Sequence, residues 1–279
     1  MEITNFSELI NAKIINKPSV SRLKDFCLNL NSVTNASAFF TDEQALANEA
    51  IKKGAYAIIS TKDLSISDKE VAFLKINDFE FALTRLLAFY SIDKRVVLLD
   101  ELSIECLNRL NITTLKNDLF YDFENILKNN LIFCSSKEYL DKLSLSYENV
   151  KYSYEIIKRS SFFYQDLILN DEYYYNVFIP IIFTEQFAKI NVFKELNINY
   201  SNLKLLDFIF LNDNNEIVKM SEGSKVVFFE NNELIISEIK KHLNLFEITE
   251  IKNHTYMLYK GDKNKFINEL NVFNEGLFL

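Results

Sequence analysis

The stretch that decides the fold class runs from Asn35 to Ser60, NASAFFTDEQALANEAIKKGAYAIIS. Its middle carries the start and stop signals of a helix, because Asp42 and Glu43 stand in the first turn, lysines in the last, and Gly54 just beyond. The apolar run AYAIIS that follows is typical of a parallel strand buried on both faces. This stretch therefore predicts a helix leading into a buried strand.

The flanking sequence repeats the pattern. Extended segments are predicted at 25–30, 38–41 and 71–76, and helices at 5–12 and 79–91, the second capped by Asp78. Strands that alternate with helices indicate an α/β domain with a parallel sheet. Residues 1–92 are accordingly predicted to form one α/β domain.

The remaining chain divides into two further predicted parts. Residues 93–222 hold a strand at 95–99, a helix at 118–128, a strand at 131–134, an antiparallel region rich in Tyr and Phe at 153–179, and helices at 184–196 and 202–211. Residues 223–279 give strands at 225–229, 246–250 and 255–260, with helices at 232–243 and 262–272. The last part is predicted to be a small α/β unit.

The composition is that of a globular protein, with 48% hydrophobic and 25% charged residues. A net charge of −8 gives no general attraction for a phosphate backbone, so no nucleic-acid partner is expected. Met1 to Lys17 includes Glu2 and Glu8 and lacks the form of a secretory signal, and no apolar stretch approaches the roughly 20 residues of a membrane span. We expect a soluble, cytoplasmic protein.

The distribution of glycine excludes the common nucleotide-binding motifs. A phosphate-binding loop needs several glycines close together, whereas the four here, Gly54, Gly223, Gly261 and Gly276, stand apart. Neither a Walker A loop nor a dinucleotide fingerprint is present, and no cofactor is expected.

No residue is assigned a catalytic or metal-binding role. His242 and His254 are interpreted as surface residues, and the three cysteines, Cys27, Cys106 and Cys134, as small buried apolar residues.

Two short clusters admit both a structural and a functional interpretation. Ser135 and Ser136 follow a predicted strand and precede a helix, so one of them is interpreted as a helix cap rather than a nucleophile. Tyr173, Tyr174 and Tyr175 could stack on a base or sugar, but alternation along a strand would place Tyr174 opposite the other two, as in half-buried packing.

A family resemblance rests on the segment CLNLNSVTNASAFFTDEQALANEAIKKGAYAIIS and its continuation FLKINDFEFALTRLLAFY. The carrying residues are Phe39, Phe40, Glu49, Ala50, Gly54, Ala55, Ala57, Ile58, Ile59, Asp78, Ala82, Leu83, Leu86, Ala88 and Tyr90. They resemble the N-terminal domain of Mur ligases, which has a helix ending E-A-x-x-x-G-A before an apolar strand and a later V-x-D-x-x-x-A-L-x-x-L-A-x-x-Y segment. The nearest subgroup is the ligase that adds D-alanyl-D-alanine to the UDP-muramoyl tripeptide.

The resemblance implies a Mur-ligase-like N-terminal α/β domain, a reduced α/β central region and a small C-terminal α/β unit. In the family this first domain binds the uridine nucleotide end of the peptidoglycan precursor. Carried over by position, the residues expected to meet such a precursor are Asn29, Asn31, Ser32 and Thr41.

The chain departs from the family where the chemistry is done. Asn29, Leu30 and Asn31 replace an Asp-Ser-Arg, and the stretch DKRVVLLDELSIECLNRL has no G-x-x-G-K-T loop. Cys134, Ser135 and Ser136 stand where the family has an N-x-D-D strand end, and Ile181, Ile182 and Glu185 where it has His, Asn and Asn. Without the loop, nothing evident holds the β- and γ-phosphates and magnesium.

Three functions follow as hypotheses. The leading one is a non-catalytic Mur-ligase-like protein, a pseudoenzyme of cell-wall (peptidoglycan) biosynthesis that binds a UDP-muramoyl precursor or a cell-wall synthesis protein. The second is an active enzyme of another class, a transferase or hydrolase with carboxylates in an inter-domain cleft. The third is a plain protein-interaction module with an exposed Phe/Tyr patch.

Overall fold

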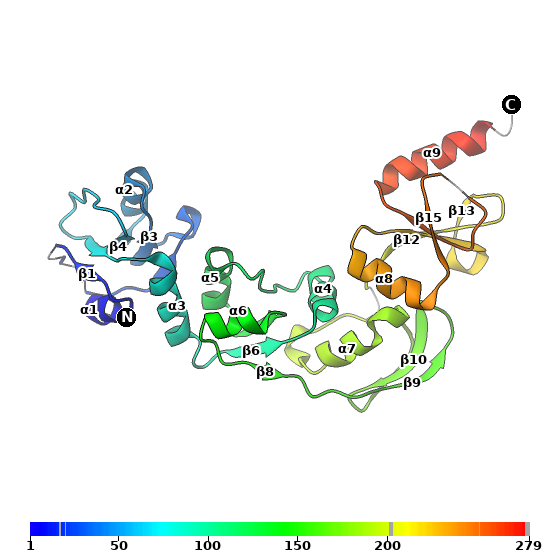
Figure 1. Ribbon diagram of the computed structural model, residues 1–279, viewed down its shortest axis with the longest axis horizontal. Helices are drawn as coiled ribbons and strands as arrows, with labels where there is room; N and C mark the ends of the chain where they lie inside the picture. The colour runs from blue at the N-terminus through cyan, green and yellow to red at the C-terminus, as the bar shows by residue number, and fades with distance from the viewer. Residues whose placement is uncertain (17, 20, 201–202, 251, 277–279) are drawn as a thin grey trace. The chain divides into compact units, whose positions relative to one another are not determined.

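The structure, a computed structural model, describes residues 1–16, 18–19, 21–200, 203–250 and 252–276, without the side chains of 272–276. The chain forms two compact units (Figure 1). The first comprises Met1–Leu99 and Thr113–Asn149, and the second Asp100–Ile112 and Val150–Leu279. The fold is mixed α/β, as predicted, and the division at residues 92 and 222 stays a prediction.

The first unit is built on a five-stranded sheet of order β1-β5-β4-β3-β2, in which only β1 is antiparallel to its neighbour. Its strands are β1 (Lys13–Ile14), β2 (Asp25–Cys27), β3 (Ser37–Phe40), β4 (Ala55–Ser60) and β5 (Ala72–Lys75). Its helices are α1 (Ile3–Leu9), α2 (Gln44–Lys52) and α3 (Phe79–Tyr90). The predicted alternation of strand and helix is confirmed.

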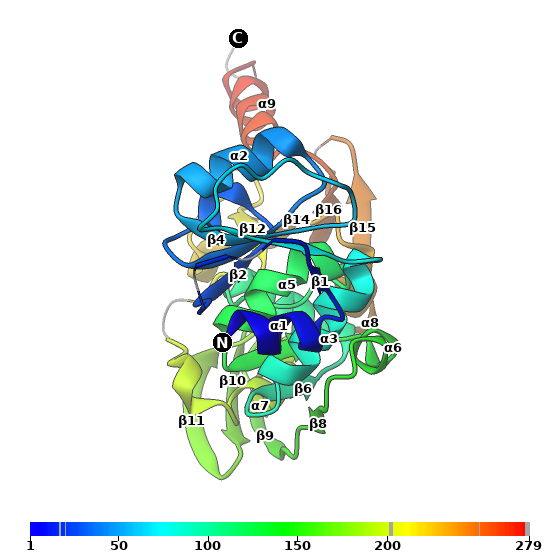
Figure 2. The same cartoon turned by 90° about the vertical axis from the view of Figure 1, so that its left-hand side faces the viewer.

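Side chains that alternate along the strands form a core on each face of this sheet. Phe39 and Ile58 pack with α2, whereas Phe40 and Ile59 pack with α1 and α3 on the other face (Figure 2). The central strands β3 and β4 are buried along almost their whole length because both faces of the sheet are covered. Gly54, which ends α2, has φ +99°, a conformation that favours glycine, so the helix stop signal is also confirmed.

A second, three-stranded parallel sheet completes the first unit. It has the order β7-β6-β8, from β6 (Arg95–Leu98), β7 (Leu131–Cys134) and β8 (Glu148–Asn149). Helix α5 (Leu119–Lys128) packs against α3, and α6 (Lys137–Lys142) begins at Ser136, whose hydroxyl accepts the Tyr139 amide. The cap interpretation of the serine pair is therefore confirmed.

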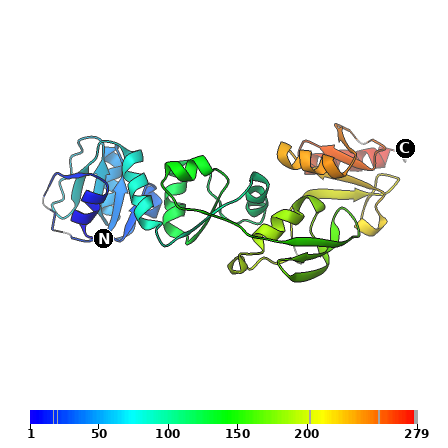
Figure 3. The same cartoon turned by 60° about the horizontal axis from the view of Figure 1, so that its bottom comes forward.

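The second unit contains a three-stranded antiparallel sheet of order β11-β10-β9 (Figure 3). Its strands are β9 (Tyr154–Arg159), β10 (Tyr164–Leu169) and β11 (Glu172–Phe178). Asn170 and Asp171, both with positive φ, form the two-residue turn between the last two strands. Tyr173 and Tyr175 are exposed while Tyr174 is half-buried, so the predicted alternation holds.

A mixed sheet of order β13-β12-β14-β16-β15 forms the rest of this unit. Its strands are β12 (Asp207–Leu211), β13 (Ile217–Val218), β14 (Lys225–Phe229), β15 (Leu245–Ile248) and β16 (Tyr256–Tyr259). The helices α8 (Glu233–His242) and α9 (Lys263–Gly276) confirm the predicted order of elements in this part of the chain.

The helix predicted at 202–211 is wrong where the structure describes it, since β12 occupies 207–211 and residues 201–202 lie outside the described residues. Its side chains alternate: Phe208 and Phe210 contact Phe163, whereas Ile209 and Leu211 enter the core on the other face. A short apolar run fits a helix or a strand, and pairing with β14 decides for the strand.

Helix α7 (Thr184–Ile190) is shorter than the predicted 184–196. The chain turns to bury Phe193, and only a 3₁₀ turn follows at Lys194–Leu196. A helix not predicted as such, α4 (Glu101–Arg109), packs against α7.

The three cysteines are free and buried, as predicted. No helix within the described ranges is both long and apolar enough to cross a bilayer.

The buried carboxylate of Asp122 holds the loop before α5 and gives the first prediction. It accepts the amides of Lys116 and Asp118 at 2.9–3.2 Å and is fully buried. Asp122→Ala leaves these donors unpaired, so the free energy of unfolding should fall by about 2–4 kcal/mol. Urea unfolding measures this. Exposed Asp141→Ala is the control, and equal losses for both variants would contradict the assignment.

Candidate functional site

A cavity of the first unit lies at the carboxyl ends of β2 and β3. It has a volume of about 710 Å³. The lining residues are Leu28, Asn29, Leu30, Phe40, Thr41, Phe79, Phe120, Tyr121, Glu124, Asn125 and Lys128. Loops at the carboxyl ends of parallel strands are the usual ligand-binding edge of an open α/β sheet, because the strands themselves are buried. We call this the first cavity.

A second cavity, of about 520 Å³, lies on the other side of the turn that follows β2. Its lining includes Asn31 and Ser32 together with Phe26, Cys27 and Tyr90. Burial raises the pKa of the Cys27 thiol to about 11, so the thiol is protonated at neutral pH and is a poor nucleophile. The second cavity therefore offers binding groups rather than an activated cysteine.

The four residues expected from the sequence are divided between the cavities. Asn29 and Thr41 line the first, and Asn31 and Ser32 line the second. The Asn29 side chain accepts the Asn31 amide at 2.8 Å, and the Thr41 hydroxyl accepts the Glu43 amide at 3.0 Å. Thr41 is buried, so it shapes the end of β3, whereas Asn29 is exposed toward solvent.

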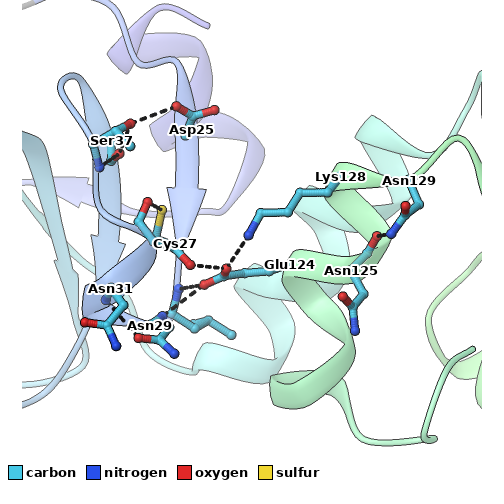
Figure 4. Close-up of polar contacts among 12 residues, drawn as sticks. Asp25, Cys27, Asn29, Asn31, Ser37, Glu124, Asn125, Lys128 and Asn129 are labelled. Atoms are coloured by element: carbon cyan, nitrogen blue, oxygen red, sulfur yellow. Dashed lines mark hydrogen bonds and ion pairs between the residues drawn. The ribbon is translucent and has the colours of Figure 1, made fainter. Parts of the chain in front are cut away.

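Glu124, on α5, stands between the two cavities and lines both. One carboxylate oxygen accepts the backbone amides of Leu28 at 3.1 Å and Asn29 at 3.0 Å. The other accepts the Ser32 hydroxyl at 2.6 Å and the Lys128 ammonium at 2.8 Å (Figure 4). We call these four hydrogen bonds the Glu124 contact: three of them tie α5 to the turn after β2, and the one from Lys128 lies within α5.

The Glu124 contact also favours the ionised form of the Glu124 carboxyl. Burial opposes ionisation of this carboxyl, but the hydrogen bonds from Lys128, Ser32 and the two amides outweigh burial and lower the pKa of Glu124. Glu124 is thus an anion at neutral pH. The Lys128 side chain is 63% exposed, so its ammonium faces both the carboxylate and the solvent.

Aromatic rings form one wall of the first cavity. Phe120 and Tyr121, in the first turn of α5, are 54% and 62% exposed, and Phe79 at the start of α3 is half-buried. Exposed rings beside amide groups suit a flat, polar ligand, because one face stacks while the edge is hydrogen-bonded. Asn29 and Asn125 supply such amides.

Sequence reasoning missed the half of the site that α5 contributes. The signal was present in the run LFYDFENILK, where Phe120, Tyr121, Glu124 and Lys128 fall on the side opposite the buried Phe123 and Ile126. Two adjacent exposed aromatic residues on the polar side of a helix are a feature that the sequence pattern alone could have singled out.

A further carboxylate, Asp42, organises the neighbouring strand ends. It accepts the Ser60 hydroxyl at 2.7 Å and the Thr61 amide at 2.7 Å. Burial opposes its ionisation, but these bonds prevail and lower the pKa of Asp42.

In the second unit, Asp100 caps the N-terminus of α4, in the stretch DKRVVLLDELSIECLNRL that has no phosphate-binding loop. Its carboxylate accepts the Ser103 amide at 2.9 Å and the Lys189 ammonium at 2.8 Å. Burial opposes ionisation of this group too, yet its partners lower the pKa of Asp100. A helix N-terminus is a natural anion site, and here the chain's own carboxylate occupies it.

The residues singled out for metal or proton chemistry do not converge. Among the residues that the structure describes, no three His, Cys, Asp or Glu side chains come together as a metal site. His242 stands in the last turn of α8, and His254 stacks on Phe246 with ring centroids 3.9 Å apart.

Comparison with known proteins gives structural neighbours only. No protein-family model and no curated protein matches the chain. A crystal structure of MurF from Acinetobacter baumannii is 11% identical, with a TM-score of 0.48, over 86% of this chain and 75% of that one. MurF ligase from Thermotoga maritima in complex with ADP is 10% identical, with a TM-score of 0.40, over 89% and 81%. These values do not assign the chain to a family.

The charge of Glu124 gives the second prediction. Because its folded-state pKa lies below the usual 4.5, the contact stabilises the fold above pH 4.5 and loses this effect as pH falls through the folded pKa. Glu124→Gln should therefore lower the free energy of unfolding by about 1–3 kcal/mol at pH 7, and by less at pH 3, since the contribution falls below pH 4.5.

Urea unfolding between pH 3 and 7 measures this difference. Glu138→Gln, an exposed change on α6, is the matched control and should shift stability by less than about 0.5 kcal/mol. A deficit for Glu124→Gln that stays constant over this pH range would contradict the role of the carboxylate.

Proposed function

We propose that the first unit binds a uridine nucleotide-sugar of the peptidoglycan-precursor type in the first cavity, and that the chain carries out no ATP-dependent ligation. The observation that carries the proposal is the meeting of Asn29 and Thr41, expected from the family resemblance, with the aromatic wall of α5 in one cavity. The positions expected from the resemblance and the chemistry of the surrounding surface are independent observations, and both support the first cavity as the binding site.

The cavity has the size and the groups that such a ligand requires. Ligand pockets usually measure about 300–1,000 Å³ and combine apolar walls with a few polar groups, and the first cavity, at about 710 Å³, falls within that range. Phe120 and Tyr121 would both contact the pyrimidine ring, and the Asn29 and Asn125 amides would meet its polar edge or the sugar hydroxyls. The ammonium of Lys128 would attract a phosphate.

We infer the absence of ligation from the residues that stand where the family has its phosphate-binding loop and its acidic pair. Asp100 holds the N-terminus of α4 and pairs with Lys189, so a triphosphate approaching there would meet a negative charge. Ser136 caps α6 where the family has an acidic pair. These contacts favour a binding protein over an ATP-dependent enzyme.

A second candidate function, protein interaction, is favoured by one surface. On the β9–β11 sheet, Tyr173 and Tyr175 are 57% and 77% exposed, and Ile157 is 48% exposed. Exposed aromatic residues of this kind are enriched in protein interfaces. The hypothesis of a transferase or hydrolase has no acid, base or nucleophile assigned to it.

The third prediction concerns ligand specificity. UDP and UDP-N-acetylmuramic acid should raise the melting temperature of the wild-type protein, because a ligand that binds only the folded state stabilises it by about 2.7 kcal/mol at 100 times its Kd. ATP should give no shift. Stabilisation by ATP, or turnover with UDP-muramoyl tripeptide, D-alanyl-D-alanine and ATP, would refute the proposal.

The fourth prediction places the ligand in the cavity. Tyr121→Ala and Phe120→Ala should each weaken UDP binding about tenfold in calorimetric titration, since stacking on one ring contributes about 1–3 kcal/mol. Both side chains are more than half exposed, so the fold should be retained. Phe81→Ala, a 49% exposed ring on α3 outside both cavities, is the matched control and should bind UDP like wild type.

A further inference from the structure

The turn after β2 presents donors of the kind that bind phosphate, and an internal carboxylate occupies them. The amides of Leu28 and Asn29, the hydroxyl of Ser32 and the ammonium of Lys128 all donate to Glu124. Two adjacent amides, a hydroxyl and a cation are an anion-binding set, since each places partial or full positive charge on one point. The carboxylate is thus held where an external anion would be bound.

The position of this contact connects it to both cavities. Glu124 and Lys128 line the first and the second cavity alike, and the Glu124 side chain is only 16% exposed. A ligand that extended from one cavity to the other would pass the carboxylate. If it carried phosphate there, it would meet like charge until Glu124 moved away.

We propose that Glu124 is an intramolecular competitor that keeps the phosphate site of the first unit closed until an anionic ligand displaces it. The proposal rests on the proposed function for the identity of the whole ligand, but its anion chemistry stands on the four donors alone. Displacement exchanges one set of charge-assisted hydrogen bonds for another, so it needs no new donor.

The strength of the competition follows from tethering. A group fixed on the same chain acts at an effective concentration in the millimolar range or above, and a free anion must compete against it. Removing the carboxylate should therefore strengthen phosphate binding, whereas removing the Lys128 cation should weaken it. A merely structural role for Glu124 predicts no gain in affinity.

The test uses sodium pyrophosphate without magnesium, titrated calorimetrically into the full chain at about 0.1 M salt, where exposed charges beyond about 10 Å are screened. Glu124→Ala should bind pyrophosphate at least about tenfold more tightly than wild type. Glu138→Ala, which removes an equal charge from an exposed position, should match wild type. Adding Lys128→Met to Glu124→Ala should reverse the gain.

The outcomes separate this inference from the proposed function. Unchanged or weaker pyrophosphate binding by Glu124→Ala, or no binding by any variant, overturns the competitor. Tight pyrophosphate binding without any UDP binding supports Glu124 as a competitor and refutes the uridine ligand. UDP binding that Glu124→Ala does not strengthen supports the uridine ligand and refutes Glu124 as a competitor. If Glu124→Ala does not fold, Glu124→Gln, which keeps the side-chain length, is measured in its place with the same criteria.

Discussion

The hydrogen bonds of Glu124 to the turn after β2 are the interaction on which the site depends. The turn leaves the sheet at residue 28, and its amides face the protein because Leu28 and Asn29 both donate to the carboxylate. The same contact brings the aromatic first turn of α5 to the carboxyl edge of the sheet. Phe123 packs on Phe40 and holds α5 against the sheet, while the Glu124 contact fixes the turn beside it, so two segments about a hundred residues apart share a cavity.

Side-chain carboxylates accept hydrogen bonds from backbone amides at the ends of several of the described helices and strands. Asp42 takes the Thr61 amide, Asp100 the Ser103 amide, and Glu124 the pair after β2. A chain with only four glycines cannot form glycine-rich loops for phosphate, and it satisfies these donors with its own acids. The α/β architecture is compatible with that substitution because it depends on the apolar strands, not on the loops.

Most of the architecture could be predicted from the sequence because the strands and helices carry strong local signals. Residues 55–60 form the predicted strand, Asp78 caps α3 as expected, and the helix predicted at 118–128 is α5. The failure at 207–211 has a clear cause: Phe208 to Leu211 are apolar in either conformation, and only pairing with β14 selects the strand. Local pattern cannot supply a partner that lies fourteen or more residues away.

For the candidate site, only the position of the expected residues could be inferred from the sequence, and their role in binding stays a prediction. Asn29, Asn31, Ser32 and Thr41 follow strands, so their place at the sheet edge was accessible from sequence, but the partner of the turn, Glu124, is contributed by a distant helix.

The most direct measurement is an NMR titration of the ¹⁵N-labelled protein with UDP. We expect the largest amide shifts on Leu28, Asn29, Thr41, Phe120 and Tyr121. Shifts confined to other residues, or none at saturating UDP, would contradict it.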